Sequence, residues 1–235
     1  MSIAEAQTVA CPECAAPQAV LLGESVNIQR SPAWRQAVLD GTFHRFACTA
    51  CGASFTVERD VLYADLLHGV LIGCFSRARR GELASLEEQL VETWVTAVET
   101  EAPPAVAAQF EGPGPRVVFG LAELRQKVVC FDAQLDDRLV EAVKLALLEG
   151  VPGAAAAGVA DLLLVAVDPA RGLVFQPVDA AGVAVGPHEV TAPLAMFEDF
   201  AATRERVAAL LPGLFERLWV HHSLAREGLA AEAAA

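Results

Sequence analysis

Two Cys-x-x-Cys pairs near the N-terminus constrain this chain more than any other feature. They are Cys11-Pro-Glu-Cys14 and Cys48-Thr-Ala-Cys51. Each pair places two sulfurs on one tight turn, and two such turns face to face form a tetrahedral cage of four sulfurs. Zn²⁺ prefers thiolate ligands at about 2.3 Å and has no geometric preference of its own. We therefore expect Cys11, Cys14, Cys48 and Cys51 to bind one structural Zn²⁺ ion.

The interval between the two pairs is long for a zinc ribbon. Thirty-three residues separate Cys14 from Cys48, so the ribbon must carry an insertion. Loop length itself costs little, because doubling a loop adds only about 0.6 kcal/mol of closure entropy. Metal binding offsets that cost, since structural zinc contributes about 10–16 kcal/mol in small fingers.

The residue that follows each pair differs between the two motifs. Gly52 follows the second pair, where a knuckle commonly turns through positive φ without steric cost. Ala15 holds the equivalent place after Cys14. We expect the first turn to be either strained by roughly 1 kcal/mol or shaped differently.

Other uses of the four cysteines are open alternatives. A dithiol redox pair is one, because Pro12 could begin a helix that lowers the pKa of Cys11. Disulfide bonds or a different metal ion are the others. Two pairs fit mutual ligation better than redox chemistry. A closed site of four cysteines has no open coordination position for a substrate.

Length and charge suggest two domains with different character. The 235 residues and the 54% hydrophobic content suffice for two domains with real cores. Residues 1–80 carry seven basic and seven acidic groups, whereas residues 81–235 carry 10 basic and 23 acidic groups. Binding to nucleic acid draws on neutralised phosphates, so we expect a protein partner instead. Arg77, Arg79 and Arg80 could meet an anion, but we interpret them as a solvated face.

The hydrophobic patterns predict short strands and helices in the N-terminal part. We expect strands over residues 19–28 and 54–57, a helix over 31–40 and a helix over 83–98. The last of these has Leu83, Leu86 and Leu90 at spacings of three and four. The stretch from Val61 to Phe75 is apolar, and its period does not separate strand from helix.

Residues 101–115 contain four of the thirteen prolines and two glycines, which indicates a linker. Beyond it we expect a strand over 116–119, helices over 121–131 and 132–149, and a loop over 153–158. A hairpin of strands 161–167 and 173–178 should follow, and residues 183–190 leave room for a third strand. The last expected element is a helix from 194 to about 227, broken at Pro212-Gly213.

These elements predict an α+β fold in two domains. Residues 1–100 would form a zinc-ribbon-like β domain with an inserted helix and a trailing helix. Residues 101–115 would be the linker. Residues 116–235 would form an acidic α+β domain, with a small antiparallel sheet covered by helices.

Several features favour a cytoplasmic protein. Residues 1–10 lack the basic segment and the long apolar segment of a secretory signal, and no apolar stretch resembles a membrane-spanning helix. Thiolate pairs persist in a reducing compartment. Cys74 and Cys130 stand alone in apolar surroundings, and we interpret them as buried, inert thiols.

The sequence contains no visible catalytic constellation, so we do not expect an enzyme. It has no glycine-rich phosphate loop, no Gly-x-Ser-x-Gly elbow and no His-Glu-x-x-His motif. Glu87-Glu88 and Asp136-Asp137 are pairs on expected helices, where adjacent side chains point about 100° apart. Such pairs do not form an acid and base on one face.

The histidines give weaker signals than the cysteines. His44 precedes Cys48 by four residues and could reach the metal, but we expect an exposed histidine on a strand. His68 has no partner in the sequence. His221 and His222 are expected near the end of a helix, where a positive charge is favourable.

Further segments occur in a recognisable order around the cysteines: Ser25-Val-Asn27, Leu39-Asp-Gly41, Phe46-Ala-Cys48, Leu62-Tyr-Ala-Asp65 and, later, residues 131–137. With the two cysteine pairs they cover about a third of the chain and resemble the CpXC family of bacterial and archaeal proteins, named for two Cys-Pro-x-Cys motifs. The resemblance implies a zinc-ribbon-like domain with Cys11, Cys14, Cys48 and Cys51 at the ligand positions. The chain departs from the pattern at Thr49, where the second motif has proline, and the resemblance supplies no reaction.

We therefore predict a non-catalytic zinc-binding protein that acts as a protein-interaction module. One alternative from another class is a thiol oxidoreductase that uses Cys11 and Cys14. Another is a zinc ribbon associated with nucleic acid through Arg30, Arg35 and Arg45. The sequence sets no oligomeric state.

Overall fold

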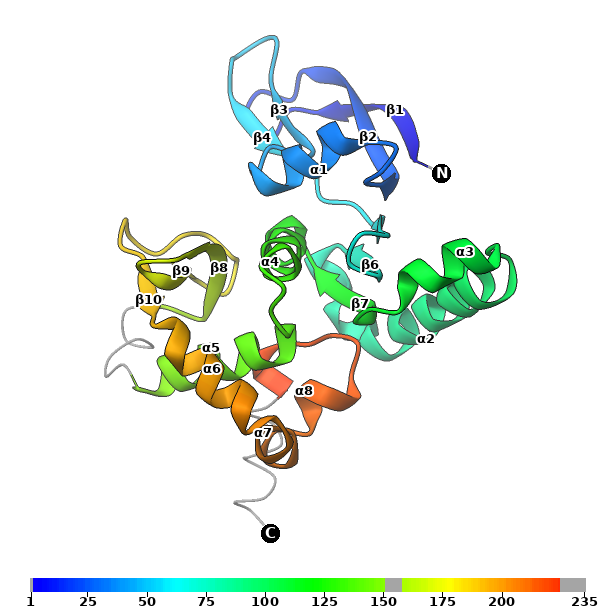
Figure 1. Ribbon diagram of the computed structural model, residues 1–235. Coiled ribbons are helices and arrows are strands. Elements are labelled where there is room, and N and C mark those ends of the chain that lie inside the picture. The colour runs from blue at the N-terminus through cyan, green and yellow to red at the C-terminus, as the bar shows by residue number, and fades with distance from the viewer. Residues whose placement is uncertain (1, 151–157, 225–235) are drawn as a thin grey trace. The chain divides into compact units, whose positions relative to one another are not determined.

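The computed structural model of the protein describes residues 2–150 and 158–224. The chain divides into two compact units, Met1–Leu124 and Arg125–Ala235, and the boundary falls within helix α4 (Leu121–Asp132). Both units combine helices with strands (Figure 1), so the predicted α+β fold is confirmed.

A five-stranded sheet forms the centre of the first unit, with the strand order β1-β2-β5-β6-β7. Its strands are β1 (Ile3–Ala10), β2 (Pro17–Asn27), β5 (Val61–Asp65), β6 (Val70–Phe75) and β7 (Gly114–Phe119). The pairs β1–β2 and β5–β6 are antiparallel, whereas β2–β5 and β6–β7 are parallel. Parallel neighbours need long crossover connections, which the remaining elements of this unit supply.

The first crossover, between β2 and β5, contains a helix and a second small sheet. Helix α1 (Pro32–Leu39) begins with proline in its first turn, as the sequence predicts. It is followed by the antiparallel strands β3 (Arg45–Ala47) and β4 (Ser54–Thr56), which pair with Phe46 opposite Phe55. Helix α1 lies between the two cysteine pairs and belongs to the insertion that their long interval requires.

The apolar stretch from Val61 to Phe75 folds into the hairpin of β5 and β6. At its turn, Asp65 Oδ1 accepts the backbone N–H groups of Leu67 and His68 at 3.0 and 3.1 Å. Every residue of β6 from Val70 to Cys74 is buried. A strand that is buried on both faces has a continuous apolar sequence, which is why its period did not identify it.

The second crossover, between β6 and β7, is helical. A 3-10 turn over Arg77–Glu82 leads into α2 (Leu83–Trp94), and a π-helical turn over Val95–Thr100 continues it. Leu86 and Leu90 are buried, as their spacing predicts. Figure 1 shows α3 beside α2 in this unit.

The predicted linker over 101–115 contains ordered elements and is not where the structure divides. Helix α3 (Pro104–Ala107) is followed by a 3-10 turn over Ala108–Phe110 and by the start of β7. Strand β7 pairs with β6 along its whole length, and Val117, Val118 and Phe119 are fully buried. The division lies after Leu124 because this pairing makes β7 part of the first unit's sheet.

The second unit contains a three-stranded antiparallel sheet with the order β10-β9-β8. Its strands are β8 (Asp161–Asp168), β9 (Gly172–Val178) and β10 (Val190–Ala192). The hairpin of β8 and β9 agrees with the prediction. The third strand is shorter and later than the expected 183–190, where only an isolated bridge pairs Ala184 with Val178 among the described residues.

Helices α5 (Asp137–Gly150), α6 (Leu194–Ala202), α7 (Arg204–Leu210) and α8 (Gly213–Glu216) complete this unit. Val143 on α5 packs with Leu164 and Phe175 of the sheet in one core. The helix expected from residue 194 is broken at Thr203 as well as at Pro212. The predicted loop over 153–158 lies outside the described residues apart from Gly158. None of the helices that the structure describes combines the length and hydrophobicity needed to span a membrane.

Candidate metal centre

Both cysteine pairs lie on the turns of β-hairpins. Residues 11–16 connect β1 to β2, and residues 48–53 connect β3 to β4. In the first turn, the N–H of Cys11 donates to the carbonyl of Ala16, and the N–H of Ala15 donates to the carbonyl of Cys11, both at 2.9 Å. The second turn repeats these two bonds with Cys48, Gly52 and Ala53, at 2.8 and 2.9 Å. The two motifs therefore fold into the same knuckle.

The residue after each pair has a positive φ. Gly52 has a φ of 75°, which glycine adopts at no steric cost, and Ala15 has a φ of 58°. Of the two outcomes that the sequence allowed for the first turn, the structure has the strained one. The positive φ of Ala15 gives the first knuckle the same shape as the second, at a backbone strain of roughly 1 kcal/mol.

The four sulfur atoms converge on one point between the hairpins. Cys11 Sγ lies 3.8 Å from Cys51 Sγ, and Cys14 Sγ lies 3.6 Å from Cys48 Sγ. All four sulfurs lie within 4.8 Å of one another. Four ligands at 2.3 Å from a tetrahedral centre are separated by about 3.8 Å. The arrangement therefore fits a metal ion held by four thiolates.

The electrostatics of the sulfurs also fit a cation. Backbone N–H groups of Cys51 and Ala50 lower the pKa of the Cys48 thiol to about 6, against the effect of burial. The N–H of Ala16 lowers the pKa of Cys14, but the neighbouring sulfurs and burial raise it to about 12. Adjacent thiolates oppose each other's ionisation. A divalent cation at the centre would allow all four sulfurs to ionise.

One cysteine of each pair is buried and the other is exposed. Cys11 and Cys48 are 2% and 3% exposed and pack with Phe55 in a small core. Half-buried Phe46 packs against this core, with its ring centroid 6.1 Å from that of Phe55. The cross-strand phenylalanine pair thus packs beside the buried cysteine of each knuckle.

Gln18 links the two hairpins and is a site residue that the sequence reasoning missed. Its Oε1 accepts hydrogen bonds from the N–H and the hydroxyl of Thr49, at 2.9 and 3.0 Å. Its Nε2 donates to the carbonyl of Pro17 at 3.0 Å. A proline at position 49 would lack the N–H, so the departure from the Cys-Pro-x-Cys pattern is matched by this contact.

His44 is not the exposed strand histidine that we expected. It is 5% exposed, has a φ of 55° and stacks on Phe43 with ring centroids 4.0 Å apart. Its Nε2 accepts the N–H of Gly23 at 2.8 Å. Burial, followed by the charge of Arg59, lowers its pKa to about 4. The neutral ring therefore joins the insertion to β2 and is not among the clustered metal-ligating groups.

The other single residues have structural surroundings. His68 Nδ1 lies 2.8 Å from Asp65 Oδ2. Cys74 and Cys130 are buried, as predicted, and burial raises the pKa of both thiols.

Asp137, of the pair Asp136-Asp137, begins helix α5, where it is buried and pairs with Lys127 Nζ at 2.8 Å. The expected position of His221 and His222 was wrong. His221 and His222 are buried beside carboxylates, because the chain beyond α8 does not form the long helix expected there.

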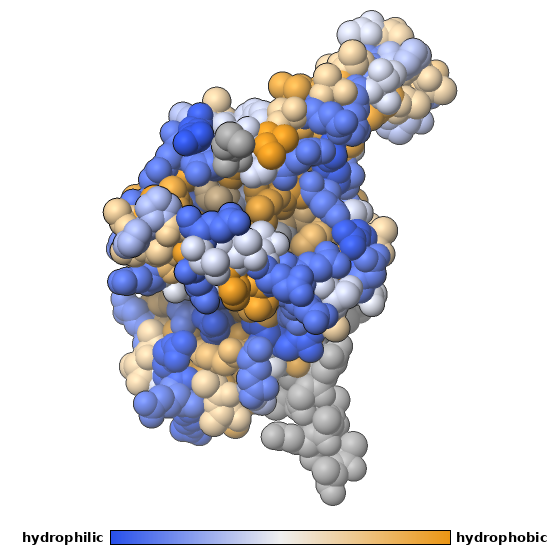
Figure 2. Space-filling model, turned by 90° about the vertical axis from the view of Figure 1, so that its right-hand side faces the viewer, coloured by the Kyte–Doolittle hydropathy of each residue, from blue (hydrophilic) through white to orange (hydrophobic). Residues whose placement is uncertain are grey.

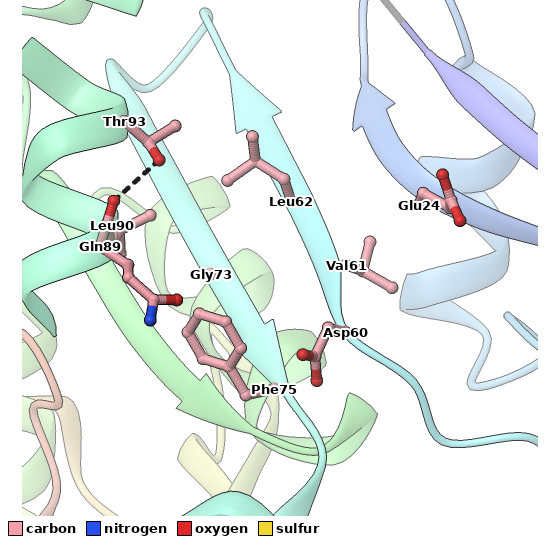
Figure 3. Close-up of a pocket in the computed structure, with 9 residues that line it drawn as sticks. All are labelled: Glu24, Asp60, Val61, Leu62, Gly73, Phe75, Gln89, Leu90 and Thr93. Atoms are coloured by element: carbon pink, nitrogen blue, oxygen red, sulfur yellow. Dashed lines mark hydrogen bonds between the residues drawn. The ribbon is translucent and has the colours of Figure 1, made fainter. Parts of the chain in front are cut away.

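A hollow of about 260 Å³ in the first unit lies between α2 and the strands β5 and β6 (Figure 3). Leu62, Phe75 and Leu90 give it apolar walls. The carboxylates at its rim are engaged by arginines: Glu24 by Arg59 at 2.7 Å and Asp60 by Arg79. Both carboxylates among its lining residues therefore form ion pairs.

The fold and the site together define an α+β protein whose N-terminal region is compatible with a zinc ribbon and whose four-cysteine centre could hold a metal ion. A family model described as CpXC protein matches residues 9–144, which is more than half of the chain. The chain belongs to the CpXC family. The comparisons with curated proteins and with solved structures found no match.

Proposed function

We propose that Cys11, Cys14, Cys48 and Cys51 bind one Zn²⁺ ion and that its role is structural. The observation that carries the proposal is the separation of 3.6 and 3.8 Å between sulfurs of different hairpins. These values match the edge of a tetrahedron of thiolates around zinc, which is about 3.8 Å. Four protein ligands fill the coordination sphere, so the ion would join the hairpins and catalyse no reaction.

The geometry gives less support to a thiol oxidoreductase. The attacking thiol of a dithiol pair is low in pKa and accessible to its substrate. Cys11 is buried, and Pro12 begins a turn that leads into β2 instead of a helix. The helix N-terminus that would have activated Cys11 is therefore absent from this described turn.

We also propose that the protein acts by binding another protein. The acidic excess, which the sequence placed in the second half, is shared: each unit carries 15 acidic residues, against 8 basic residues in the first and 9 in the second. Arg77, Arg79 and Arg80 lie beside Glu58, Glu82 and Glu123, which favours the solvated-face interpretation over an anion site. An acidic surface repels nucleic acid and suits a partner with a basic surface.

The hydropathy of the surface is compatible with recognition through charge. Figure 2 shows hydrophilic residues spread over the visible face, with smaller hydrophobic areas between them. The test is chromatography of the zinc-loaded chain on immobilised polynucleotide and on an immobilised basic protein at rising salt. We expect retention on the basic protein alone, and retention on the polynucleotide would contradict the proposal.

Alkylation before and after chelation tests the structural role of the zinc. Zinc-bound thiolates are damped nucleophiles, so Cys11, Cys14, Cys48 and Cys51 should alkylate slowly in the native protein. They should become reactive together once a strong chelator removes the metal. Buried Cys74 serves as the internal control that stays slow until denaturant is added. Fast and selective labelling of Cys11 with zinc still bound would support the redox alternative.

A further inference from the structure

A second cluster of metal-ligating side chains lies in the second unit, outside the residues that the family model matches. Asp161 begins β8, and His221 and His222 lie in the segment after α8. One ligand atom from each of the three lies within 4.8 Å of the others. We propose that Asp161, His221 and His222 bind a divalent transition-metal ion through one oxygen and two nitrogens.

The separation between Asp161 Oδ2 and His221 matches a coordination sphere. Asp161 Oδ2 lies 3.4 Å from His221 Nε2, and the other oxygen of the same carboxylate, Oδ1, lies 3.3 Å from His222 Nδ1. Ligands at 2.0–2.1 Å from a tetrahedral metal are separated by about 3.3–3.4 Å. These distances are long for a charge-assisted hydrogen bond, which is about 2.7–2.9 Å.

His222 has a ring nitrogen that is directed into the cluster and is not satisfied. Its side chain is 3% exposed, and Nδ1 forms no hydrogen bond with any described residue. The nearest acceptors are Asp161 Oδ1 at 3.3 Å and Glu141 Oε2 at 3.5 Å. A buried polar atom without a hydrogen bond is costly, and a bound metal ion would satisfy it.

The segment that carries the two histidines is fixed in place from both sides. Lys127 Nζ donates to the carbonyl of Val220 at 3.0 Å. The N–H of His222 donates to Glu141 Oε2 at 3.0 Å. His221 stacks on Trp219, with ring centroids 4.8 Å apart. The imidazoles are therefore held before any ion binds, as a preorganised site requires.

The charges in the cluster leave room for a cation. Lys144 Nζ lies 2.9 Å from both Glu141 Oε2 and Asp161 Oδ1, and an ammonium at this distance keeps both carboxylates ionised. Two carboxylates and one ammonium leave one negative charge that is buried and uncompensated when both imidazoles are neutral. A divalent cation would offset it.

Lys144 and the ion would use different parts of the cluster. Glu141 is already occupied, since its Oε1 accepts Gln126 Nε2 at 2.7 Å and its Oε2 accepts the N–H of His222. Asp161 Oδ1 accepts Lys144, whereas Oδ2 faces His221 Nε2. The oxygen nearest to the ion would therefore be Asp161 Oδ2.

Two imidazoles and one carboxylate indicate the class of metal. Nitrogen and oxygen donors of this kind suit Zn²⁺, Fe²⁺, Co²⁺ and Ni²⁺, whereas Ca²⁺ and Mg²⁺ prefer oxygen donors alone. Three protein ligands also leave at least one coordination position open. This centre would thus differ from the closed four-cysteine centre in both donor set and access.

The competing interpretation is a proton in place of a metal. His221 Nδ1 lies 2.8 Å from the Ser223 hydroxyl, to which its N–H can donate so that Nε2 is free for a metal. The N–H of Ser223 also reaches Nδ1, at 3.2 Å, and favours the tautomer with the proton on Nε2. In that case the proton on His221 would meet Asp161 and no ion would bind.

Titration with Co²⁺ distinguishes the two. The full chain is first loaded with one equivalent of zinc, which fills the cysteine site because thiolates select zinc. We expect a second equivalent to bind as Co²⁺ with weak visible bands and without the intense sulfur-to-metal charge-transfer absorption of a thiolate site. His222→Gln should lose this equivalent, and His188→Gln, a change at an exposed histidine, should keep it.

The absence of a second equivalent in the wild-type chain would overturn the proposal, as would its retention in a folded His222→Gln variant. If that variant does not fold, NMR of wild-type protein with labelled histidines shows whether Co²⁺ binds at His221 and His222. Paramagnetic Co²⁺ should then broaden the imidazole signals of His221 and His222 and spare that of His188. Broadening of His188 in place of these two would mean that the ion binds elsewhere.

Discussion

Ala15 and Gly52 occupy equivalent places after the two cysteine pairs, and both have a positive φ, of 58° and 75°. Glycine adopts this conformation at no steric cost, whereas an alanine there is strained by the contact of its Cβ with the backbone. The two knuckles therefore have the same shape but different residues at the strained position.

The two knuckle positions give a matched pair of substitutions. Ala15→Gly should raise the free energy of unfolding of the zinc-loaded protein by about 1 kcal/mol, because it relieves the positive φ. Gly52→Ala should lower it by a similar amount, since a Cβ there meets nothing within 4 Å and only the backbone is strained. Urea unfolding of the three proteins measures both. Equal stabilities would show that the turn at Ala15 is relaxed.

Gln18 should influence metal affinity without touching the metal. Gln18→Ala removes the acceptor of the Thr49 N–H and hydroxyl, so the second knuckle loses its link to the first hairpin. We expect zinc affinity to fall about tenfold, the low end for residues that orient metal ligands. Competition with a chromophoric chelator measures it. Gln29→Ala, at an exposed position, is the control, and an equal loss in both variants would rule out a specific role.

At this scale the sequence predicted part of the site. The spacing of the cysteines predicted that the four sulfurs come together, and Gly52 predicted one of the two positive φ angles. The strain at Ala15 was left open, because a sequence does not say whether a turn changes shape or accepts strain. Gln18 was missed because its contact with Thr49 spans 31 residues and depends on how the hairpins meet.

His44 should make stability depend on pH in a defined window. Its pKa is about 4 in the folded protein, against an ordinary value of 6.5 for a solvated histidine. The unfolded chain therefore binds the proton first, and the stability from the neutral ring is lost as pH falls from 6.5 toward 4. Urea unfolding of the zinc-loaded wild type and of His44→Gln should show the wild-type advantage shrinking over that range. The pH dependence of zinc binding is common to both proteins, so it cancels in the difference between their free energies of unfolding. A difference that stays constant between pH 6.5 and 4 would contradict this account.

At the scale of elements, hydrophobic periodicity predicted the amphipathic helices but did not identify strands β1 and β6 of the first sheet. Helix α2 and the β8–β9 hairpin have clear patterns and appear as predicted. Strand β1 is an edge strand with an exposed, mixed sequence, and β6 is buried throughout. Neither kind of strand shows the alternation on which sequence reasoning depends.

The close approach of Gly112 to the β5–β6 turn explains why residues 101–115 are not a free linker. A Cβ on Gly112 would lie 2.1 Å from the carbonyl oxygen of His68 and 2.9 Å from that of Gly69. Gly112→Ala should therefore destabilise the first unit by about 1–3 kcal/mol, the usual cost of overpacking. Gly81→Ala, where a Cβ would meet nothing within 4 Å, should be close to neutral. Thermal unfolding of both variants and the wild type measures their stabilities. A Gly112→Ala variant as stable as the wild type would mean that residues 101–115 are loosely attached to the sheet.

At the scale of the whole molecule, the sequence predicted two parts, but the structure divides them after Leu124. Proline and glycine content indicated a linker because composition carries no information on long-range strand pairing. The pairing of β7 with β6 joins residues about 44 apart in the sequence, from Val70 to Gly114. When charged residues are counted within the two observed units, each unit has an excess of acidic residues.

The central claim is that four cysteines on two hairpins hold one zinc ion. X-ray absorption at the zinc edge, on the full chain with one equivalent of zinc, tests it most directly. We predict a single shell of four sulfurs at about 2.3 Å. Cys48→Ser should reduce the shell to three sulfurs or release the ion. A wild-type shell that contains nitrogen or oxygen in place of any sulfur, or a chain that retains no zinc, would contradict the account.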